Sequence, residues 1–109
     1  MIIFDLRGLQ DGDESVALIE GPYRRFMDAQ TPDKSCLTLV DARGTPNSAR
    51  GTAAMREFAR LNIPYVNASA VLTSAAIHRL VVGTVAMATK RKIKAFEEER
   101  AALEWLVAQ

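Results

Sequence analysis

The chain has 109 residues, 49% of them hydrophobic and 25% charged, a balance that fits one compact domain over residues 1–109 and excludes a mainly disordered chain. Its 14 basic and 13 acidic residues nearly cancel, so no overall field draws the protein to nucleic acid or to an anionic membrane. The longest nearly apolar stretch, residues 80–88, is too short to span a bilayer, and the amino-terminal segment lacks the features of a secretion signal. We therefore expect a cytoplasmic protein with no transmembrane segment and no nucleic-acid partner.

Short apolar segments, typical of buried strands, alternate along the chain with longer segments whose apolar residues recur at helical spacing. In chain order, the expected elements are residues 2–6 (strand), 13–30 (helix), 37–40 (strand), 48–61 (helix), 65 or 66–72 (strand), 75–90 (helix), 93–96 (strand) and 97–108 (helix). This order predicts an α/β domain with about four mostly parallel strands and four helices packed on the faces of the sheet.

Local breaks mark the ends of the first two elements. Gly8 bounds the first strand, and a turn at residues 11–13 supplies capping groups for the first helix. Gly21 and Pro22 interrupt this helix, because proline lacks an amide donor and its ring clashes with the carbonyl one turn earlier. We expect a kink there, or two short helices.

The second and third strands have different patterns. Residues 37–40 are apolar except for Thr38, which suits a central strand covered on both faces. The third strand alternates between two faces, with Val66, Ala68, Ala70 and Leu72 on one and Asn67, Ser69 and Val71 on the other.

Four stretches of the sequence together resemble one known family. They are "IIFDLRGL" from Ile2, "LTLVDARGT" from Leu37, "MREFARLNIPYVNASAV" from Met55 and "IKAFEEERAALEWL" from Ile93. With these stretches the chain resembles the small bacterial STAS-like domains, which are relatives of the sporulation anti-sigma-factor antagonist and are also described as Sec14-like. The resemblance implies an α/β domain that acts as a binding or regulatory module and not as an enzyme.

The same resemblance bears on Ser48. In the sigma-regulating members, a phosphorylatable serine follows an aspartate in an Asp-Ser-Ser-Gly turn, at the start of the helix after the central strand. The counterpart here is "NSARG", residues 47–51, which lacks the acid and carries an inserted arginine, Arg50. Ser48 is the candidate phosphorylation site.

Two loops follow the second and third strands, at the edge where open α/β sheets place ligand crevices. Their candidate ligand-binding or partner-binding residues are Asp41, Arg43, Thr45, Ser48, Thr73 and Ser74. Helix starts near Ser48 and Ser74 also present free amides that suit an anion.

The same loop residues also have plain structural roles. Asn47 or Ser48 can cap the following helix, Asp41 can pair with Arg43 or a backbone amide, and Thr73 or Ser74 can cap the helix after the third strand. These alternatives remain open at the level of sequence.

Sequence features of catalysis are sparse. Residues 44–52 lack the Gly-Lys-Ser/Thr ending of a phosphate-binding loop. His78 is the only histidine, so a histidine-based metal set cannot form, and we expect a solvated or partly packed side chain there rather than a catalytic base. We expect no metal, no cofactor and no enzymatic activity.

The helix over residues 75–90 is apolar over a wider arc than one sheet contact needs. The side chains expected to face the sheet are Ile77, Leu80, Val81, Thr84, Val85 and Ala88. Val82, Ala86 and Met87 are also apolar and require another cover, which is a neighbouring helix, a second subunit or an apolar ligand. The basic residues 90–92 complement the negative pole of this helix.

Two functions from different classes fit these patterns. One is a regulator that binds a protein partner or a second copy of itself, as a homodimer, through residues 45–48 and the broad apolar face of the helix over 75–90. The other is a carrier of a small apolar or anionic, lipid-like ligand held under that helix. In the carrier, Arg43 or the loop amides hold the anionic head group.

Overall fold

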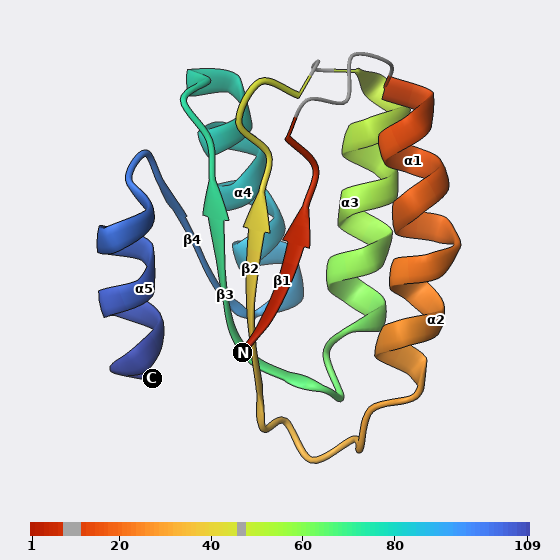
Figure 1. Ribbon diagram of the computed structural model, residues 1–109, viewed down its shortest axis with the longest axis vertical. Coiled ribbons are helices and arrows are strands. Elements are labelled where there is room, and N and C mark those ends of the chain that lie inside the picture. The colour runs from red at the N-terminus through yellow and green to blue at the C-terminus, as the bar shows by residue number, and fades with distance from the viewer. Residues whose placement is uncertain (8–11, 46–47) are drawn as a thin grey trace.

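Strands and helices alternate along the chain, as the sequence predicts, in a computed structural model that describes residues 1–7, 12–45 and 48–109 (Figure 1). The elements are β1 (Ile2–Asp5), α1 (Gly12–Glu20), α2 (Pro22–Asp28), β2 (Cys36–Asp41), α3 (Ala49–Leu61), β3 (Val66–Leu72), α4 (Ala76–Thr89), β4 (Lys92–Phe96) and α5 (Glu99–Val107). Gly8, Asp11 of the expected capping turn and Asn47 lie outside the described residues.

The four strands form one parallel sheet in the order β1-β2-β3-β4. Each strand therefore pairs with the next one along the chain, and the helices are the crossover connections that parallel pairing requires. The α/β fold class and the single domain with a mostly parallel sheet are as expected.

The break at Gly21 and Pro22 produces two short helices, α1 and α2, which is one of the two expected outcomes. The backbone turns sharply at Gly21, with φ −104° and ψ −101°, and its amide donates to the Ala17 carbonyl. A Cβ atom at this position would lie 2.8 Å from that carbonyl oxygen, so the turn requires glycine.

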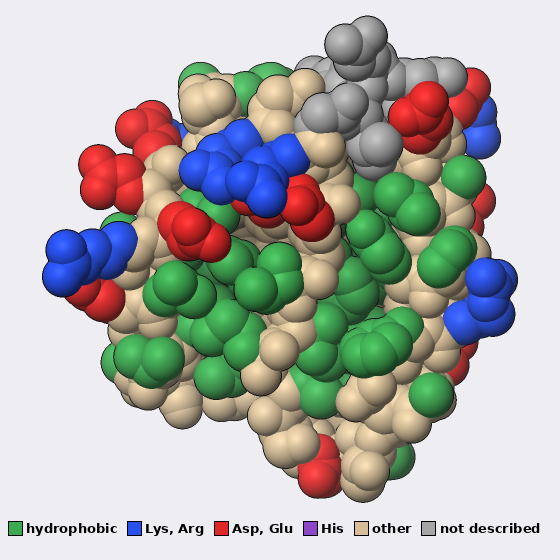
Figure 2. Space-filling view, viewed as in Figure 1, with side chains coloured by type: hydrophobic (Ala, Val, Ile, Leu, Met, Phe, Trp, Pro, Cys, Tyr) green, Lys and Arg blue, Asp and Glu red, His purple; other side chains and the backbone are tan. Residues whose placement is uncertain are grey.

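The helices cover the two faces of the sheet unequally. Residues of α1, α2 and α3 form the larger core with Phe4 and Val40 on one face, where α4 also packs. On the other face, α5 alone packs over β3 and β4, through Ala102 and Leu106. In Figure 1, α5 lies on the opposite side of the strands from α4. Ile3 of β1 is consequently 58% exposed. Figure 2 shows hydrophobic side chains at the surface of the molecule.

The expected faces of β3 are wrong at Val66. Cys36 pairs with Val66, but Leu37 pairs with Ala68, so the register shifts by one residue at Asn67. Val66 therefore packs in the larger core with Val71, whereas Ala68, Ala70 and Leu72 pack under α5 as predicted. An irregularity of this kind reverses the side-chain alternation beyond it.

Within the described residues, no helix is long and apolar enough to cross a membrane.

Candidate functional site

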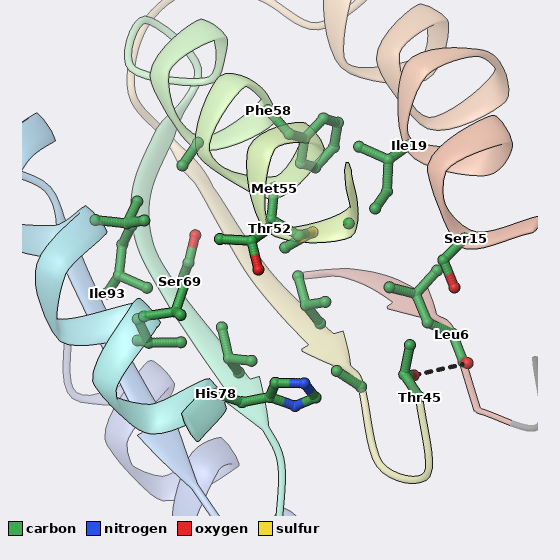
Figure 3. Close-up of a pocket in the computed structure, with 18 of the residues that line it drawn as sticks. Leu6, Ser15, Ile19, Thr45, Thr52, Met55, Phe58, Ser69, His78 and Ile93 are labelled. Carbon is green, nitrogen blue, oxygen red and sulfur yellow. Dashed lines mark hydrogen bonds between the residues drawn. The ribbon is translucent and has the colours of Figure 1, made fainter. Parts of the chain in front are cut away.

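A cavity of about 120 Å³ lies between the sheet and helices α1, α3 and α4 (Figure 3). Figure 3 shows His78 of α4 and Thr45 of the loop after β2 on one side of it, and Phe58 of α3 on another. Asn62 and Arg91, which precede β3 and β4, also line the cavity. The cavity thus extends from the carboxyl edge of the parallel sheet to its amino edge, between walls that are mainly apolar.

Arg91 supplies a charged group to this cavity. Lys90, with φ 55°, ends α4 in the left-handed conformation, and Arg91 follows it directly before β4. Its guanidinium donates from Nη1 to the Ala59 carbonyl of α3, at 3.1 Å, and from Nη2 to Ser69 Oγ of β3, at 2.6 Å. The Nε atom is buried and has no hydrogen-bond partner among the residues that the structure describes.

The electrostatic environment of Arg91 is unusual because its charge has no acidic partner among the described residues. Burial lowers the pKa of Arg91 to about 10, which leaves it charged at neutral pH. The Ala59 carbonyl belongs to the last turn of α3, whose negative pole offsets part of the charge.

The expected role of the basic residues 90–92 at the end of α4 is wrong for Arg91. No basic residue lies in the last turn of α4. Arg91 instead donates a hydrogen bond to the Ala59 carbonyl at the end of α3. Arg91, directly before β4, lies on the same side as Ile93, which packs against the larger core, while Lys92 between them is exposed. This alternation is the sequence signal that distinguishes Arg91 from its basic neighbours.

Further polar groups in the cavity wall are buried. Thr38 of β2 and Ser69 of β3 are register partners, and their hydroxyl oxygens lie 2.5 Å apart in a hydrogen bond. Ser15 Oγ and Asn62 Oδ1 are buried, and neither has a hydrogen-bond partner in the described part of the chain. Buried polar atoms of this kind carry a desolvation cost that a bound polar group can relieve. Sequence patterns did not single out any of these residues.

At the carboxyl edge, His78 Nδ1 and Thr73 Oγ1 form a hydrogen bond of 2.9 Å. His78 is half-buried, as expected, and Thr73 is fully buried. The Thr73 hydroxyl also accepts from the Ala75 amide, but the N-cap position of α4 is Ala75 and Ser74 is exposed. Capping of α4 by Ser74 is therefore wrong, because the helix begins one residue later than expected.

Asp41 and Arg43 form an ion pair that does not line the cavity. Arg43 donates from Nε to Asp41 Oδ1 at 2.9 Å and from Nη2 to Oδ2 at 2.6 Å, and Arg7 lies 3.2 Å from Oδ2. This hydrogen bonding to Arg43 lowers the pKa of Asp41, which is only 5% exposed. With Asp5 and Arg7 the pair forms a charged cluster on the sheet face that α5 covers in part, as Figure 2 shows.

Thr45 and Ser48, from the same loop, do line the cavity. Thr45 Oγ1 donates to the Leu6 carbonyl, which joins this loop to the end of β1. Ser48 is the N-cap of α3, and its Oγ accepts from the Gly51 amide at 2.9 Å. The loop residues proposed from the sequence are thus divided between two faces. The capping role of Ser48 and the pairing of Asp41 with Arg43 are confirmed.

The side chains of α4 that are buried differ from those that the sequence predicts. Val82 is half-buried and Val85 is 7% exposed; both line the cavity. Ala86 is half-buried, so of the three residues expected to need another cover, only Met87 is fully exposed, at 83%. Ile77 and Leu80, expected to face the sheet, are exposed instead. The helix is apolar on so many sides that its periodicity does not define one face.

Within residues 1–7, 12–45 and 48–109, no cluster of three or more His, Cys, Asp or Glu side chains has the arrangement of a metal site.

The Asp41 ion pair predicts a pH-dependent stability. Since the pKa of Asp41 lies below its ordinary value of 3.8, the pair stabilises the fold fully above that pH and loses its effect as pH falls through the lowered pKa. Asp41→Asn should lower the free energy of unfolding by about 1–3 kcal/mol at pH 7, measured by urea titration. The difference from the unmodified protein should shrink toward pH 2.

Asp28→Asn, which removes an exposed i,i+4 partner of Arg24, is the control and should change little at either pH. A deficit in Asp41→Asn that is constant with pH would contradict this account.

The cap at Ser48 predicts a second effect. Ser48→Ala should cost about 1 kcal/mol of unfolding free energy, because the Gly51 amide loses its acceptor. Ser48→Asp should retain most of the stability, since aspartate is also a good N-cap and favours the positive helix end. Equal stability of Ser48→Ala and the unmodified protein would show that the cap contributes nothing.

Comparison with known proteins bears on the fold. No family model and no curated protein matches the chain. Among solved structures, the chain is similar to an uncharacterised protein of the DUF3478 family from Shewanella loihica PV-4, which has a SpoIIAA-like fold. The two are 17% identical with a TM-score of 0.58, and the match covers 97% of this chain and 79% of the other. The comparison confirms the expected STAS-like fold.

Proposed function

We propose that the protein is a non-catalytic binding module that holds a small, mainly apolar molecule in the cavity between the sheet, α3 and α4. The supporting observation is the cavity itself, with apolar walls and a volume of about 120 Å³. An apolar cavity of about 150 Å³ in another protein stays dry and binds benzene. A ligand of roughly six carbon atoms therefore suits a space of this volume.

The absence of catalysis is part of this proposal. A general base needs a free proton-accepting atom and a pKa matched to neutral pH. Asp5 and Asp41 are both held in ion pairs that lower their pKa values, to about 2 for Asp5 because of its hydrogen bond to Arg7. The His78 Nδ1 atom is bound to Thr73, and none of the hydrogen bonds found for His78 in the described residues joins it to a carboxylate.

The cavity explains part of the apolar excess of α4. Val82 and Val85 of α4 and Phe58 of α3 line it from two helices, and Val71 contributes the sheet side. Of the expected contributors to a ligand site, Thr45 and Ser48 line the cavity, whereas Arg43 does not, because its guanidinium is bound to Asp41. The carrier function thus fits the geometry with a different charged residue from the one expected.

This proposal predicts that filling the cavity abolishes binding. Val82→Phe places a larger side chain in the wall, and 1-hexanol binding, measured by isothermal titration calorimetry, should be lost. Leu80→Phe is the matched control on the exposed side of the same helix, at 67% exposure, and should bind as the unmodified protein does. Native mass spectrometry of protein purified from cells should also show a retained small molecule. No binding of 1-hexanol and a clean apo mass would together refute the proposal.

A second candidate function is a protein-interaction regulator, and one observation favours it. Ile77, Leu80 and Met87 are exposed by 46%, 67% and 83% and share one side of α4. Their spacing of three and seven residues places them in one apolar stripe. A second copy of the chain, or another protein, would bury this stripe.

The regulator predicts a dimer in solution. Light scattering should give twice the mass of one chain, and Leu80→Glu should give the monomer, because it places a charge in the interface. Val107→Glu, on α5 and 74% exposed, is the control and should leave the mass unchanged. A strictly monomeric unmodified protein would remove the support for a homodimer.

A further inference from the structure

We infer that the ligand of this cavity is a small monocarboxylate, whose carboxylate binds Arg91 and whose hydrocarbon body lies between α3, α4 and the sheet. The inference rests on the binding function proposed above and specifies the chemical class of its ligand.

The first support is a partly buried charge that has no acidic partner among the described residues. Most other arginines in the described residues form an ion pair with a carboxylate, as Arg43 does with Asp41 and Arg60 with Glu57. Arg91 is different, because its guanidinium donates only to a carbonyl and a hydroxyl and no carboxylate faces it from the described parts of α3, β3 or β4. Partial burial of a charge without a counter-charge carries a desolvation cost, and an anion in the cavity would offset that cost.

The second support is the geometry of the guanidinium. The Ala59 carbonyl and Ser69 Oγ each accept one hydrogen bond from it and so fix its plane, and Ser69 is itself bound to Thr38. The Nε atom has no hydrogen-bond partner within residues 1–7, 12–45 and 48–109, and Arg91 lines the cavity. Nε and a terminal nitrogen form the edge of a guanidinium that matches a carboxylate in a bidentate pair. Arg91 is thus oriented before any ligand binds.

The third support is the charge in the cavity together with its mainly apolar wall, because these two properties favour some anions over others. The end of α3 offsets about half a charge at Arg91, so the cavity suits one negative charge and not two. A phosphate group carries more charge and has three oxygens to satisfy, but Arg91 is the one charged side chain that lines this cavity within the described residues. The remaining wall is mainly apolar and suits a hydrocarbon body.

The experiment compares three probes that separate head group from body. Affinities of hexanoate, 1-hexanol and acetate are measured at pH 7 by calorimetry with the unmodified protein, Arg91→Met and Lys92→Met. Hexanoate should bind about ten- to a hundredfold more tightly than 1-hexanol, because a charged hydrogen-bonded contact replaces a neutral one. Acetate should bind far more weakly than hexanoate, since it lacks the apolar body.

Arg91→Met should abolish the preference for hexanoate while 1-hexanol still binds. Lys92→Met removes an exposed cation one residue away and should change neither affinity. Equal affinities of hexanoate and 1-hexanol in the unmodified protein, or a preference that survives Arg91→Met, would overturn the inference and leave the apolar binding function standing. Failure of both six-carbon probes to bind would overturn the binding function itself.

A direct measurement on the unmodified protein distinguishes carboxylate binding by Arg91 from a purely structural role at the end of α3. This measurement does not depend on the stability of Arg91→Met. In ¹⁵N-labelled protein, the Nε–H resonance of Arg91 should shift on titration with hexanoate and stay in place with 1-hexanol. An Nε–H resonance that hexanoate does not move would show that Arg91 only closes the end of α3.

Discussion

The parallel register of β2, β3 and β4 is the constraint on which the cavity depends. Thr38 pairs with Ser69, and Ser69 with Ile93, so the two hydroxyls meet across the sheet face, and Arg91, directly before β4, donates to Ser69. The same guanidinium binds the Ala59 carbonyl, which holds the end of α3 against these strands. A shift of one residue in this register would move the hydroxyls to the α5 side and leave the guanidinium without partners. Sheet pairing, helix placement and the charge in the cavity are therefore one connected arrangement.

Much of the fold follows from local sequence. A proline in the interior of a helix kinks or breaks it, as Pro22 does between α1 and α2, and Ser48 accepts a hydrogen bond from an amide at the start of α3. Both effects act over a few residues and were predicted. The alternation of apolar strands and amphipathic helices likewise specifies a parallel sheet, since parallel strands need long crossovers. The register shift at Asn67 was not predicted, because it depends on how β2 and β3 meet and not on either strand alone.

The candidate site was predicted only in part. Proximity in sequence suggested that Asp41, Arg43, Thr45 and Ser48 act together, but side-chain alternation at the end of β2 sends Asp41 to one face of the sheet, and the loop returns Thr45 to the other. Arg91 was missed for a related reason. A basic residue beside other basic residues is usually solvated. The path of the chain after Lys90 instead places the Arg91 side chain against α3 and β3.

Helix α4 connects the two candidate functions physically. Val82 and Val85 line the cavity on its inner side, while Leu80 and Met87 are exposed on its outer side, less than one turn away along the helix. A rigid helix transmits a shift of one side to the other, because its interior is close-packed and does not deform locally. Any ligand that displaces α4 would then change the outer stripe, and a partner on that stripe would change the affinity for the ligand by the same factor. The two proposed functions would thus act on one element, and the strength of their coupling would depend on how far α4 moves when the cavity is filled.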